Sequence, residues 1–541
     1  MSFYKFFYNF YYKNKFILFN KKYFKNKKIS EIDEKILIEF NAFHDSHVNL
    51  SIFSNYFREK YNYKIVAFFN YSLLSADLYF SLYNKIKWNL GNFFSLKNFG
   101  IYKSFNTKQI IRPIINKYIF NKSEKYFLKT IRNIKNKNDL LNLKINNVLL
   151  GDLLYDTYLK SRVTPTINIY SKDFRNFYLD FICLFLFWSH YFKNNKVKII
   201  LGVHSVYSYA VPLRAAIKEG VEAYIVHTNE IIKYNKDNMF GTVHTSSDYK
   251  DYKKNFRNLP KKVQQKGLEM SKLKLQQRFR GAVGVNVNMD YADKSSFSSI
   301  KNSPSLKKSD KFKILICTHD FFDSPHIYGK FLFSDHYEWL NYLSELSKHT
   351  DFEWYVKNHP SYGDKFQIYQ KFTDDVVFRI FNNHPKIKIL PNNISHKKLI
   401  KEGIKAILTC YGSVVVEYAY FSIPSVITCP TGPYVNYKFT FNPKTITEYK
   451  SIITKLDQIK FKVNKKEIFE YYFMKNLLQR DDWLGLNYKE ILSRIGGYHF
   501  LRTPNFYKFW INYYNDKNKK KIYNNIDSFF NSNTNYFLHQ K

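Results

Sequence analysis

Two short polar segments in the second half of the chain each follow an apolar run and carry residues that can bind phosphate. The first is 357–360, Lys-Asn-His-Pro, which follows the run 352–356. The second is 411–413, Tyr-Gly-Ser, which follows the run 406–410. In an open α/β sheet, ligands bind outside the carboxyl ends of the strands. The two segments therefore predict a nucleotide site.

The imidazole of His359 and the ammonium of Lys357 supply complementary phosphate contacts. A proline follows His359, which favours an extended loop conformation there. The imidazole can donate a hydrogen bond to a phosphate oxygen, and Lys357 adds a point charge. A plain turn is the alternative, because His384-Pro385 is the same dipeptide. That second pair precedes an expected strand, so function is favoured for His359.

The second segment leads into a helix expected over 414–421. Gly412 lets a ligand approach the backbone closely. Ser413 is expected to cap the helix, whose first amides then form an anion site. Glu417 lies four residues later on the same helix face. We expect Glu417 to accept hydrogen bonds from ribose hydroxyls, with an ordinary solvent-facing charge as the alternative.

Short apolar runs alternate with helical stretches, which predicts βαβ units and parallel sheets. In the second half, strands are expected over 313–317, 352–356, 386–390, 406–410 and 425–428. Helices are expected between them over 336–347, 365–372, 395–402 and 414–421, with Gly403 as a C-terminal cap. The first half is less regular, with strands expected over 35–40, 64–69, 147–150, 197–201 and 223–226.

The predicted fold class is α/β, with two Rossmann-like doubly wound domains facing a cleft and helical, aromatic extensions at both ends. The predicted divisions are a basic aromatic extension (1–30), an acceptor domain (31–300), a hinge (301–311), a nucleotide-sugar domain (312–450) and a helical extension (451–541). The end of that last extension, 512–541, has low complexity and is expected to fray.

Composition limits the classes of function. The 541 residues carry a formal net charge of +41, which attracts polyanions. The lysines are spread along the chain without a nucleic-acid-binding motif, so dedicated nucleic-acid binding is not expected.

Four scattered cysteines fit a reducing cytosol. The longest apolar stretch, 181–188, is too short to span a bilayer. The aromatic and basic residues 1–28 suit a peripheral contact with the inner membrane, with a disordered tail as the alternative.

The motifs together resemble a known group of enzymes. The Lys-x-His-Pro segment, the Gly-Ser turn, the helix with Glu417 and the Pro-Ser-Val strand at 424–426 resemble the second domain of bacterial surface-polysaccharide glycosyltransferases of GT-B type. The resemblance is strongest over 313–447. Segments 151–159 and 204–220 are similar to surface-carbohydrate biosynthesis proteins of the same broad group.

This resemblance implies a cytidine nucleotide. In families that use CMP-activated acidic sugars, including capsular Kdo (3-deoxy-manno-octulosonate) transferases and several sialyltransferases, the His-Pro histidine contacts the CMP phosphate. That role would fall on His359, with phosphate and ribose contacts from the Gly-Ser turn and Glu417. Teichoic-acid glycerophosphotransferases, which use CDP-glycerol, show a comparable His-Pro and Ser-rich turn.

Inverting transfer needs a general base and stabilisation of the departing phosphate, and it does not require a metal. Asp152 and Asp156 follow the strand expected to end at Leu150, and Asp320 and Asp323 follow the strand expected to end at Cys317. These four aspartates and His359 are the candidate catalytic residues. For any single aspartate, a loop or helix-cap role is the alternative.

Three further polar groups have two readings each. His319, Asp320, Asp323 and His326 could be metal ligands, but their spacing fits no closed zinc pattern, so no metal is expected. Residues 44–47, His-Asp-Ser-His, could contact the acceptor or form a polar loop. Arg278 and Arg280 could pair with an acidic sugar or end a solvated helix.

The sequence thus predicts a cytoplasmic glycosyltransferase that moves a sugar from a nucleotide donor to a capsular, surface-polysaccharide or lipid-linked acceptor. A CMP-linked acidic sugar such as Kdo or a sialic-acid-like sugar is the preferred donor, and no cofactor is expected. The alternatives are a CDP-glycerol-type polyol-phosphate transferase, a UDP-sugar epimerase-like enzyme and a non-catalytic surface-glycan assembly factor.

Overall fold

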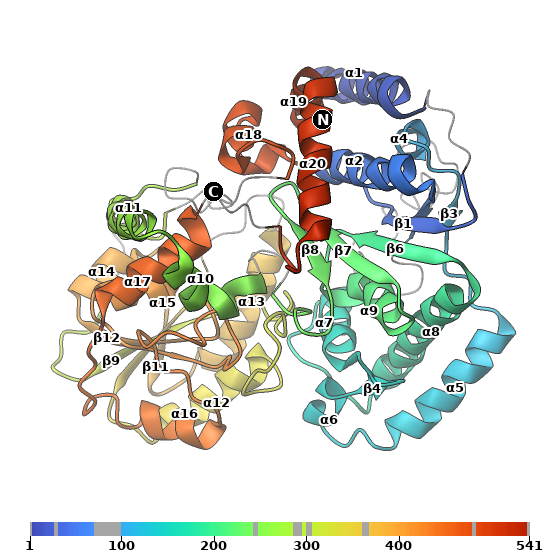
Figure 1. Cartoon of the computed structure of the whole chain (residues 1–541). Helices are drawn as coiled ribbons and strands as arrows, with labels where there is room; N and C mark the ends of the chain where they lie inside the picture. The colour runs from blue at the N-terminus through green and yellow to red at the C-terminus, as the bar shows by residue number, and fades with distance from the viewer. Residues whose placement is uncertain are drawn as a thin grey trace. The chain divides into compact units, whose positions relative to one another are not determined.

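The computed structural model divides the chain into two units (Figure 1). Unit 1 comprises Met1–Arg162, Asn168–Val243 and Gln479–Lys541, and unit 2 comprises Val163–Ile167 and His244–Leu478. The structure describes residues 3–25, 31–69, 99–241, 247–284, 295–298, 306–359, 367–478 and 483–537.

Unit 1 is built on a six-stranded sheet of order β3-β2-β1-β6-β7-β8. Its strands are β1 (Lys35–Glu39), β2 (Lys64–Phe68), β3 (Ile110–Ile111), β6 (Val197–Gly202), β7 (Glu222–Val226) and β8 (Ile231–Tyr234). All neighbours are parallel except β8, which is antiparallel to β7. The chain runs outward from β1 to β3 and resumes on the other side of β1 at β6. The sheet is therefore doubly wound, with its reversal between β1 and β6.

The helices of unit 1 come from both ends of the chain as well as from its middle. They are α1 (Phe3–Asn20), η1 (Lys21–Lys25), α2 (His44–Tyr61), α4 (Phe99–Ser104), α5 (Lys117–Ile131), α6 (Lys137–Leu141), α7 (Gly151–Arg162), α8 (Lys172–Asn194), η2 (Tyr207–Ala210), α9 (Val211–Lys218), α18 (Tyr488–Ile495), η7 (Tyr498–Phe500), α19 (Pro504–Tyr513) and α20 (Asp516–Asn531). Helix α8 begins where Ser171 accepts a hydrogen bond from the amide of Phe174, and its inner face buries Phe181 and Trp188.

Unit 2 is built on a five-stranded parallel sheet of order β11-β10-β9-β12-β13. Its strands are β9 (Lys313–Cys317), β10 (Glu353–Lys357), β11 (Ile387–Leu390), β12 (Ile404–Thr409) and β13 (Ser425–Ile427). Alternate residues of the central strand enter different cores: Ile314 and Ile316 belong to one apolar cluster and Leu315 to another. Because successive side chains of a strand point to opposite faces, both faces of this sheet are covered.

The helices of unit 2 are η3 (Ser247–Asp251), α10 (Tyr252–Asn258), α11 (Lys261–Phe279), α12 (His336–Lys348), α13 (Gln367–Phe381), α14 (His396–Lys401), α15 (Val414–Tyr420), α16 (Ile446–Ile453), α17 (Lys465–Tyr472) and η6 (Phe473–Leu477). Asp335 caps α12 by accepting a 2.8 Å hydrogen bond from the amide of Glu338. Gly403 follows α14 with a φ of 95°, which a glycine adopts without strain, so the predicted C-terminal cap is confirmed.

The predicted α/β class with two doubly wound sheets is confirmed, as are the strand positions of the second half. A strand does form within the expected range 147–150, but it does not belong to a parallel sheet, so that part of the prediction is wrong. There β4 (Lys144–Ile145) and β5 (Val148–Leu149) pair only with each other, antiparallel. Asn146 and Asn147 have φ values of 51° and 65°, which is the backbone of a tight hairpin turn. Strands β3 and β8 were not predicted.

The units divide the chain differently from the predicted domains. Helix α11 precedes the predicted hinge but belongs to unit 2, where it packs against α17 and η6. A Cβ at Gly267 would lie 2.8 Å from the ring of Phe473, so the two elements approach very closely. Of the predicted hinge, 301–305 lies outside the described residues, and the Leu306 amide donates to Glu402 in unit 2.

The predicted N-terminal extension and the part of the predicted C-terminal extension from Gln479 onward belong to unit 1, whereas 451–478 belong to unit 2. Helix α1 lies against α19, as Figure 1 shows. The expected fraying of 512–541 is wrong for the residues described there, because α20 is a helix and the Phe537 amide donates a 2.9 Å hydrogen bond to the carbonyl of Ile231. Buried aromatic residues such as Phe16 and Trp510 contribute to the packing of the described parts of these segments.

Candidate functional site

The five parallel strands of unit 2 end at the same edge of the sheet, and β9, β10, β11 and β12 lead into polar segments there. The chain runs from β9 to β11 on one side and from β12 to β13 on the other, so the direction reverses between β9 and β12. Loops diverge at such a reversal and leave room for a ligand. The predicted segments 357–359 and 411–413 follow β10 and β12, the two neighbours of β9. The structure thus brings both predicted segments to one edge, while Pro360 lies outside the described residues.

Lys357 is the last residue of β10, and its side chain is buried at 2% exposure. Burial lowers the pKa of its ammonium to about 8, and the nearby charge of Glu417 opposes that shift in part. Within the described residues the ammonium makes no hydrogen bond or ion pair. A buried cation without a partner is unfavourable unless something else compensates it. Lys357 is therefore suited to an anionic ligand.

Asn358 fixes the loop that carries His359. Its side-chain carbonyl accepts a 2.7 Å hydrogen bond from Thr318, which follows β9, and its amide donates at 2.7 Å to Asp374 of α13. Asp374 also accepts two 3.0 Å hydrogen bonds from Asn392, which follows β11. These contacts join the segments after three neighbouring strands. Sequence reasoning missed this network because its members are scattered along the chain.

Three histidines lie close enough at this edge to influence one another. His359 is exposed, whereas His396 at the start of α14 is buried. Burial and then the charge of Lys357 hold the pKa of His396 well below its usual range, with smaller contributions from Arg278 and His359. Burial holds the pKa of His319 low as well, with the charges of His336 and His359 adding to the effect.

His396 and His319 each lie within hydrogen-bond distance of a side-chain hydroxyl. His396 Nδ1 lies 2.9 Å from the hydroxyl of Tyr418, and His319 Nε2 lies 3.1 Å from the hydroxyl of Thr409. The sequence analysis had considered His319 only as a metal ligand and had missed His396. The signal for His396 was its position after an expected strand, which is the same argument that selected His359.

The turn before α15 differs from the prediction at Ser413. A Cβ at Gly412 would lie 3.1 Å from Thr409 Oγ1 and 3.5 Å from His319 Cε1, so a side chain there would press on that contact. Ser413 has helical backbone angles and its side chain does not cap α15, so the predicted cap is wrong. The Ser413 hydroxyl makes no hydrogen bond to the described residues. The hydroxyl can therefore still form a hydrogen bond with a ligand.

Glu417 is buried, so the alternative of a solvent-facing charge is wrong. Its carboxylate is buried and accepts a hydrogen bond from Arg278 Nε at 2.5 Å. Arg278 is also buried, so it pairs with Glu417 and is not part of a solvated helix end. Arg280, at the end of α11, is exposed. The pair lies near Lys357 and His396, because the charge of Glu417 acts on the pKa of Lys357 and the charge of Arg278 acts on the pKa of His396.

The segment after β9 holds the two remaining aspartates of unit 2. Asp320 Oδ1 accepts a 3.1 Å hydrogen bond from Thr373, and Asp323 is exposed. His326 Nε2 lies 3.0 Å from the carbonyl of Ser334. Among the residues that the structure describes, no group of three His, Cys, Asp or Glu side chains is placed to hold a metal ion.

The two aspartates of unit 1 lie on α7, which packs against η2, the short helix that follows β6. Asp152 receives two hydrogen bonds from Arg214, at 2.7 and 2.6 Å, and both side chains are buried. Asp156 lies one turn later and is also buried. The premise that these residues follow a strand of the main sheet is wrong, because β5 belongs to the separate hairpin. Asp152 is therefore part of a buried ion pair.

A different polar group lies after β1, where the strand order of the unit 1 sheet reverses. His44 and Asp45 begin α2 directly after β1, so the expected polar loop is a helix start. One carboxylate oxygen of Asp45 and Nδ1 of His44 are buried without a hydrogen-bond partner among the described atoms. Burial raises the pKa of Asp45, and it lowers the pKa of His44 to about 4. His47, by contrast, has both ring nitrogens in contact, with Tyr507 and with the carbonyl of Asn41.

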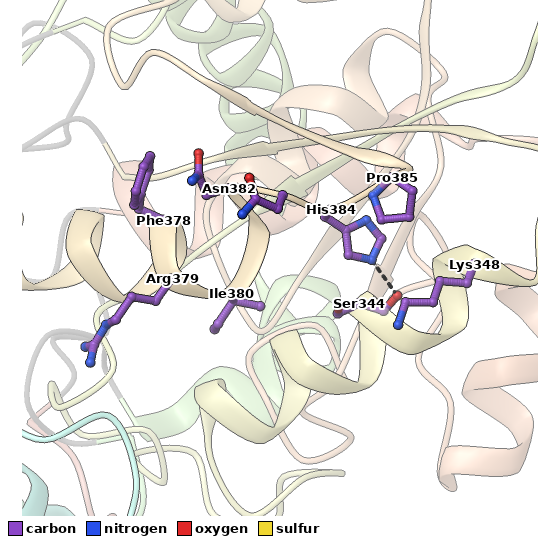
Figure 2. Close-up of a pocket in the computed structure, with 9 residues that line it drawn as sticks. Ser344, Lys348, Phe378, Arg379, Ile380, Asn382, His384 and Pro385 are labelled. Carbon is purple, nitrogen blue, oxygen red and sulfur yellow. Dashed lines mark hydrogen bonds between the residues drawn. The ribbon is translucent and has the colours of Figure 1, made fainter.

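A cavity of about 470 Å³ lies at the opposite edge of unit 2, between the ends of α12 and α13 (Figure 2). His384 is one of its lining residues, and its Nε2 lies 3.0 Å from the carbonyl of Ser344, as Figure 2 shows. Its Nδ1 accepts hydrogen bonds from the amides of Lys386 and Ile387, at 3.2 and 3.0 Å. Both nitrogens of this histidine therefore stabilise the turn before β11.

Comparisons with known proteins give only weak likenesses. No family model matches the chain, and no curated protein matches it. Similar solved structures include KpsC, a beta Kdo 2,4 transferase from Thermosulfurimonas dismutans (11% identity, TM-score 0.30, 51% of this chain and 79% of that one). They also include MnaA with UDP from S. aureus (10% identity, TM-score 0.23, 82% and 92%) and a UDP-GlcNAc 2-epimerase with UDP-GlcNAc from Neisseria meningitidis (8% identity, TM-score 0.21, 82% and 97%). At these TM-scores the likenesses carry no argument about function.

The carboxyl edge of unit 2 gathers groups whose chemistry suits an anion. Lys357, His359 and His396 supply one buried ammonium and two imidazoles at the carboxyl edge of a parallel sheet, beside a Gly-Ser turn. Donors of this kind bind phosphate oxygens and stabilise negative charge that develops on them.

Proposed function

We propose that unit 2 binds the phosphate of a nucleotide sugar and that the protein is a glycosyltransferase. The observation that carries the proposal is the buried Lys357 ammonium, which has no partner among the described residues and lies at the edge where His359 and His396 also lie. The His-Pro and Gly-Ser motifs favour a CMP-linked acidic sugar as the donor. A surface polysaccharide or lipid-linked glycan in the cytoplasm is the proposed acceptor.

In this reaction the bond between the anomeric carbon and the phosphate oxygen breaks, and an acceptor oxygen forms the new bond to that carbon. The departing CMP gains negative charge, which Lys357 and His359 would stabilise. The acceptor hydroxyl gives its proton to a carboxylate. Asp156, Asp320 and Asp323 remain candidates for that base, and we add Asp45. A carboxylate whose pKa is raised by burial is a stronger base near neutral pH.

A thermal-shift experiment with CMP, CDP, UDP and GDP tests the proposal. CMP should raise the unfolding temperature selectively, because a ligand at a hundredfold excess over its Kd stabilises the folded state by about 2.7 kcal/mol. Stabilisation by CDP with turnover of CDP-glycerol would replace the proposal with a polyol-phosphate transferase. Stabilisation by UDP alone would indicate a UDP-sugar enzyme, and no response to any nucleotide would contradict nucleotide binding.

The affinity for CMP is expected to fall as the pH rises above about 8. The pKa of Lys357 is lowered to about 8 in the folded protein, so the ammonium loses its charge above that pH. CMP remains fully ionised there, because the second phosphate pKa is about 6. The affinity should fall by up to about tenfold per pH unit until the pKa of the bound state is reached. Isothermal titration between pH 7 and 9.5 measures it.

The Lys357→Met variant is the control for this pH dependence. It should bind CMP more weakly at pH 7, and its affinity for CMP should change little up to pH 9.5.

The free energy of unfolding of this variant should also lack one contribution that depends on pH in the unchanged protein. The unfolded chain binds more protons than the folded one between the lowered pKa of about 8 and the ordinary value of 10.5. Lys357 therefore adds to the free energy of unfolding as the pH rises through that window. An unchanged pH profile in the variant would contradict the assignment of Lys357.

A further inference from the structure

Helix α1 presents one apolar face that no described part of the chain covers. Phe6, Phe7, Phe10, Tyr11 and Leu18 form this outer face; Phe6 and Phe10 are each 58% exposed and Leu18 is 63% exposed. The spacing of these five residues places them on one side of a helix. Scattered exposed apolar residues need no explanation, but five large ones gathered on one helix indicate a contact surface.

The opposite face of α1 holds the helix firmly on unit 1. Phe16 and Phe19 are buried there, and the ring of Phe16 stacks on Tyr507 of α19 at 4.3 Å between centroids. Near the other end of the helix, the hydroxyl of Tyr8 donates a 3.0 Å hydrogen bond to Asn505. The helix is therefore docked by one face, and its outer face is displayed in a fixed orientation on unit 1.

The charged residues of the segment that contains α1 are all positive. No Asp or Glu precedes Glu31, whereas the first thirty residues contain eight lysines. Lys15, Lys21 and Lys22 are exposed, and the ammonium of Lys15 lies 4.5 Å from the ring centroid of Tyr11. Aromatic residues bordered by lysines are typical of helices that lie in the interface of a bilayer. Among the described residues, no helix is long and apolar enough to cross one.

We propose that the outer face of α1 binds the surface of an anionic lipid bilayer. Phe6, Phe10 and Leu18 enter the boundary between headgroups and acyl chains, while the lysines attract anionic headgroups. A bilayer fits better than a second copy of the chain, because two identical faces bordered by lysines would repel each other. This inference goes beyond the proposed transferase activity and does not depend on it.

The test is co-sedimentation of the full-length protein with vesicles, without nucleotide. Vesicles of phosphatidylcholine alone are compared with vesicles that also contain phosphatidylglycerol. The protein should bind the mixed vesicles, and the Phe6→Ser/Phe10→Ser/Leu18→Ser variant should lose at least about tenfold in partitioning. The Lys15→Gln/Lys21→Gln/Lys22→Gln variant should lose the preference for the anionic vesicles, as should the unchanged protein at high salt.

Helix α5 provides a matched control, because it is another basic helix of unit 1 with exposed apolar side chains. Tyr118, Phe120 and Leu128 are exposed on it at 58%, 43% and 50%. The Tyr118→Ser/Phe120→Ser/Leu128→Ser variant should bind the mixed vesicles as the unchanged protein does. The proposal is overturned if the α1 serine variant binds normally or if both serine variants lose binding equally. It is also overturned if light scattering shows a dimer that this α1 variant dissociates while the unchanged protein binds no vesicles.

Discussion

Replacing His359 with alanine is expected to lower the turnover of a CMP-sugar donor by about 10²–10³-fold, the usual cost of removing one donor to a developing oxyanion. The protein should nevertheless unfold at nearly the same temperature. His359 is exposed, and substitutions of exposed residues usually change the free energy of unfolding by less than about 0.5 kcal/mol. The measurement is the rate of CMP release from CMP-Kdo or CMP-sialic acid, together with thermal unfolding.

His384→Ala is the matched control, because His384 also precedes a proline but lies at the opposite edge of the same sheet. Both of its ring nitrogens are in hydrogen bonds that stabilise the turn before β11. Its replacement should cost about 1–3 kcal/mol of stability and leave turnover per folded molecule unchanged. Normal turnover in His359→Ala, or equal losses in the two variants, would remove His359 from the site.

The strands around the site could be predicted because each is a short apolar run with polar residues at its end. Ile314, Leu315 and Ile316 read as continuous apolar sequence, since both faces of the sheet are covered. The position of β9 at the centre could not be predicted in this way, because the order of strands depends on contacts between distant segments. Once that order is known, the segments after β10 and β12 necessarily lie on either side of β9.

Sequence reasoning failed mainly to predict which charged residues pair with one another. Glu417 was expected to bind ribose or to face solvent, and Arg278 was expected to bind an acidic sugar or to end a solvated helix. Neither alternative paired the two residues, which lie 139 positions apart in the sequence. A single sequence shows the type of each charge and its local position but not its partner. The hairpin at Asn146 and Asn147 is different, because two asparagines between the β-branched residues Ile145 and Val148 are a recognisable local turn signal. That signal was in the sequence and was overlooked.

Asp152 shows how the same limit affects a catalytic assignment. It was predicted as a candidate base on the ground that it followed a strand of the main sheet. In the structure its carboxylate receives both of its short hydrogen bonds from Arg214, whose guanidinium also donates at 2.7 Å to the carbonyl of Leu149. A bidentate pair of this kind is a strong contact, and it engages both oxygens of the carboxylate.

Breaking this pair is expected to destabilise the protein strongly without changing the chemistry. Asp152→Asn and Arg214→Met each leave one buried group without its partner, which typically costs about 3–5 kcal/mol. The double variant should lose less than the sum of the single losses, because it leaves no uncompensated charge. Urea unfolding of the three variants measures these energies, with turnover normalised to the folded fraction.

Asp323→Asn is the control for a carboxylate outside a buried ion pair. Asp323 is exposed, so its replacement should change stability by less than about 0.5 kcal/mol. If Asp152→Asn instead folds with normal stability and loses turnover, the structural role is wrong and Asp152 returns as the candidate base. If it loses stability but keeps turnover per folded molecule, the search for the base narrows to Asp45, Asp156, Asp320 and Asp323. Of these, Asp45 combines a raised pKa with a carboxylate oxygen that no described atom contacts by a hydrogen bond, so Asp45→Asn is the next variant to measure.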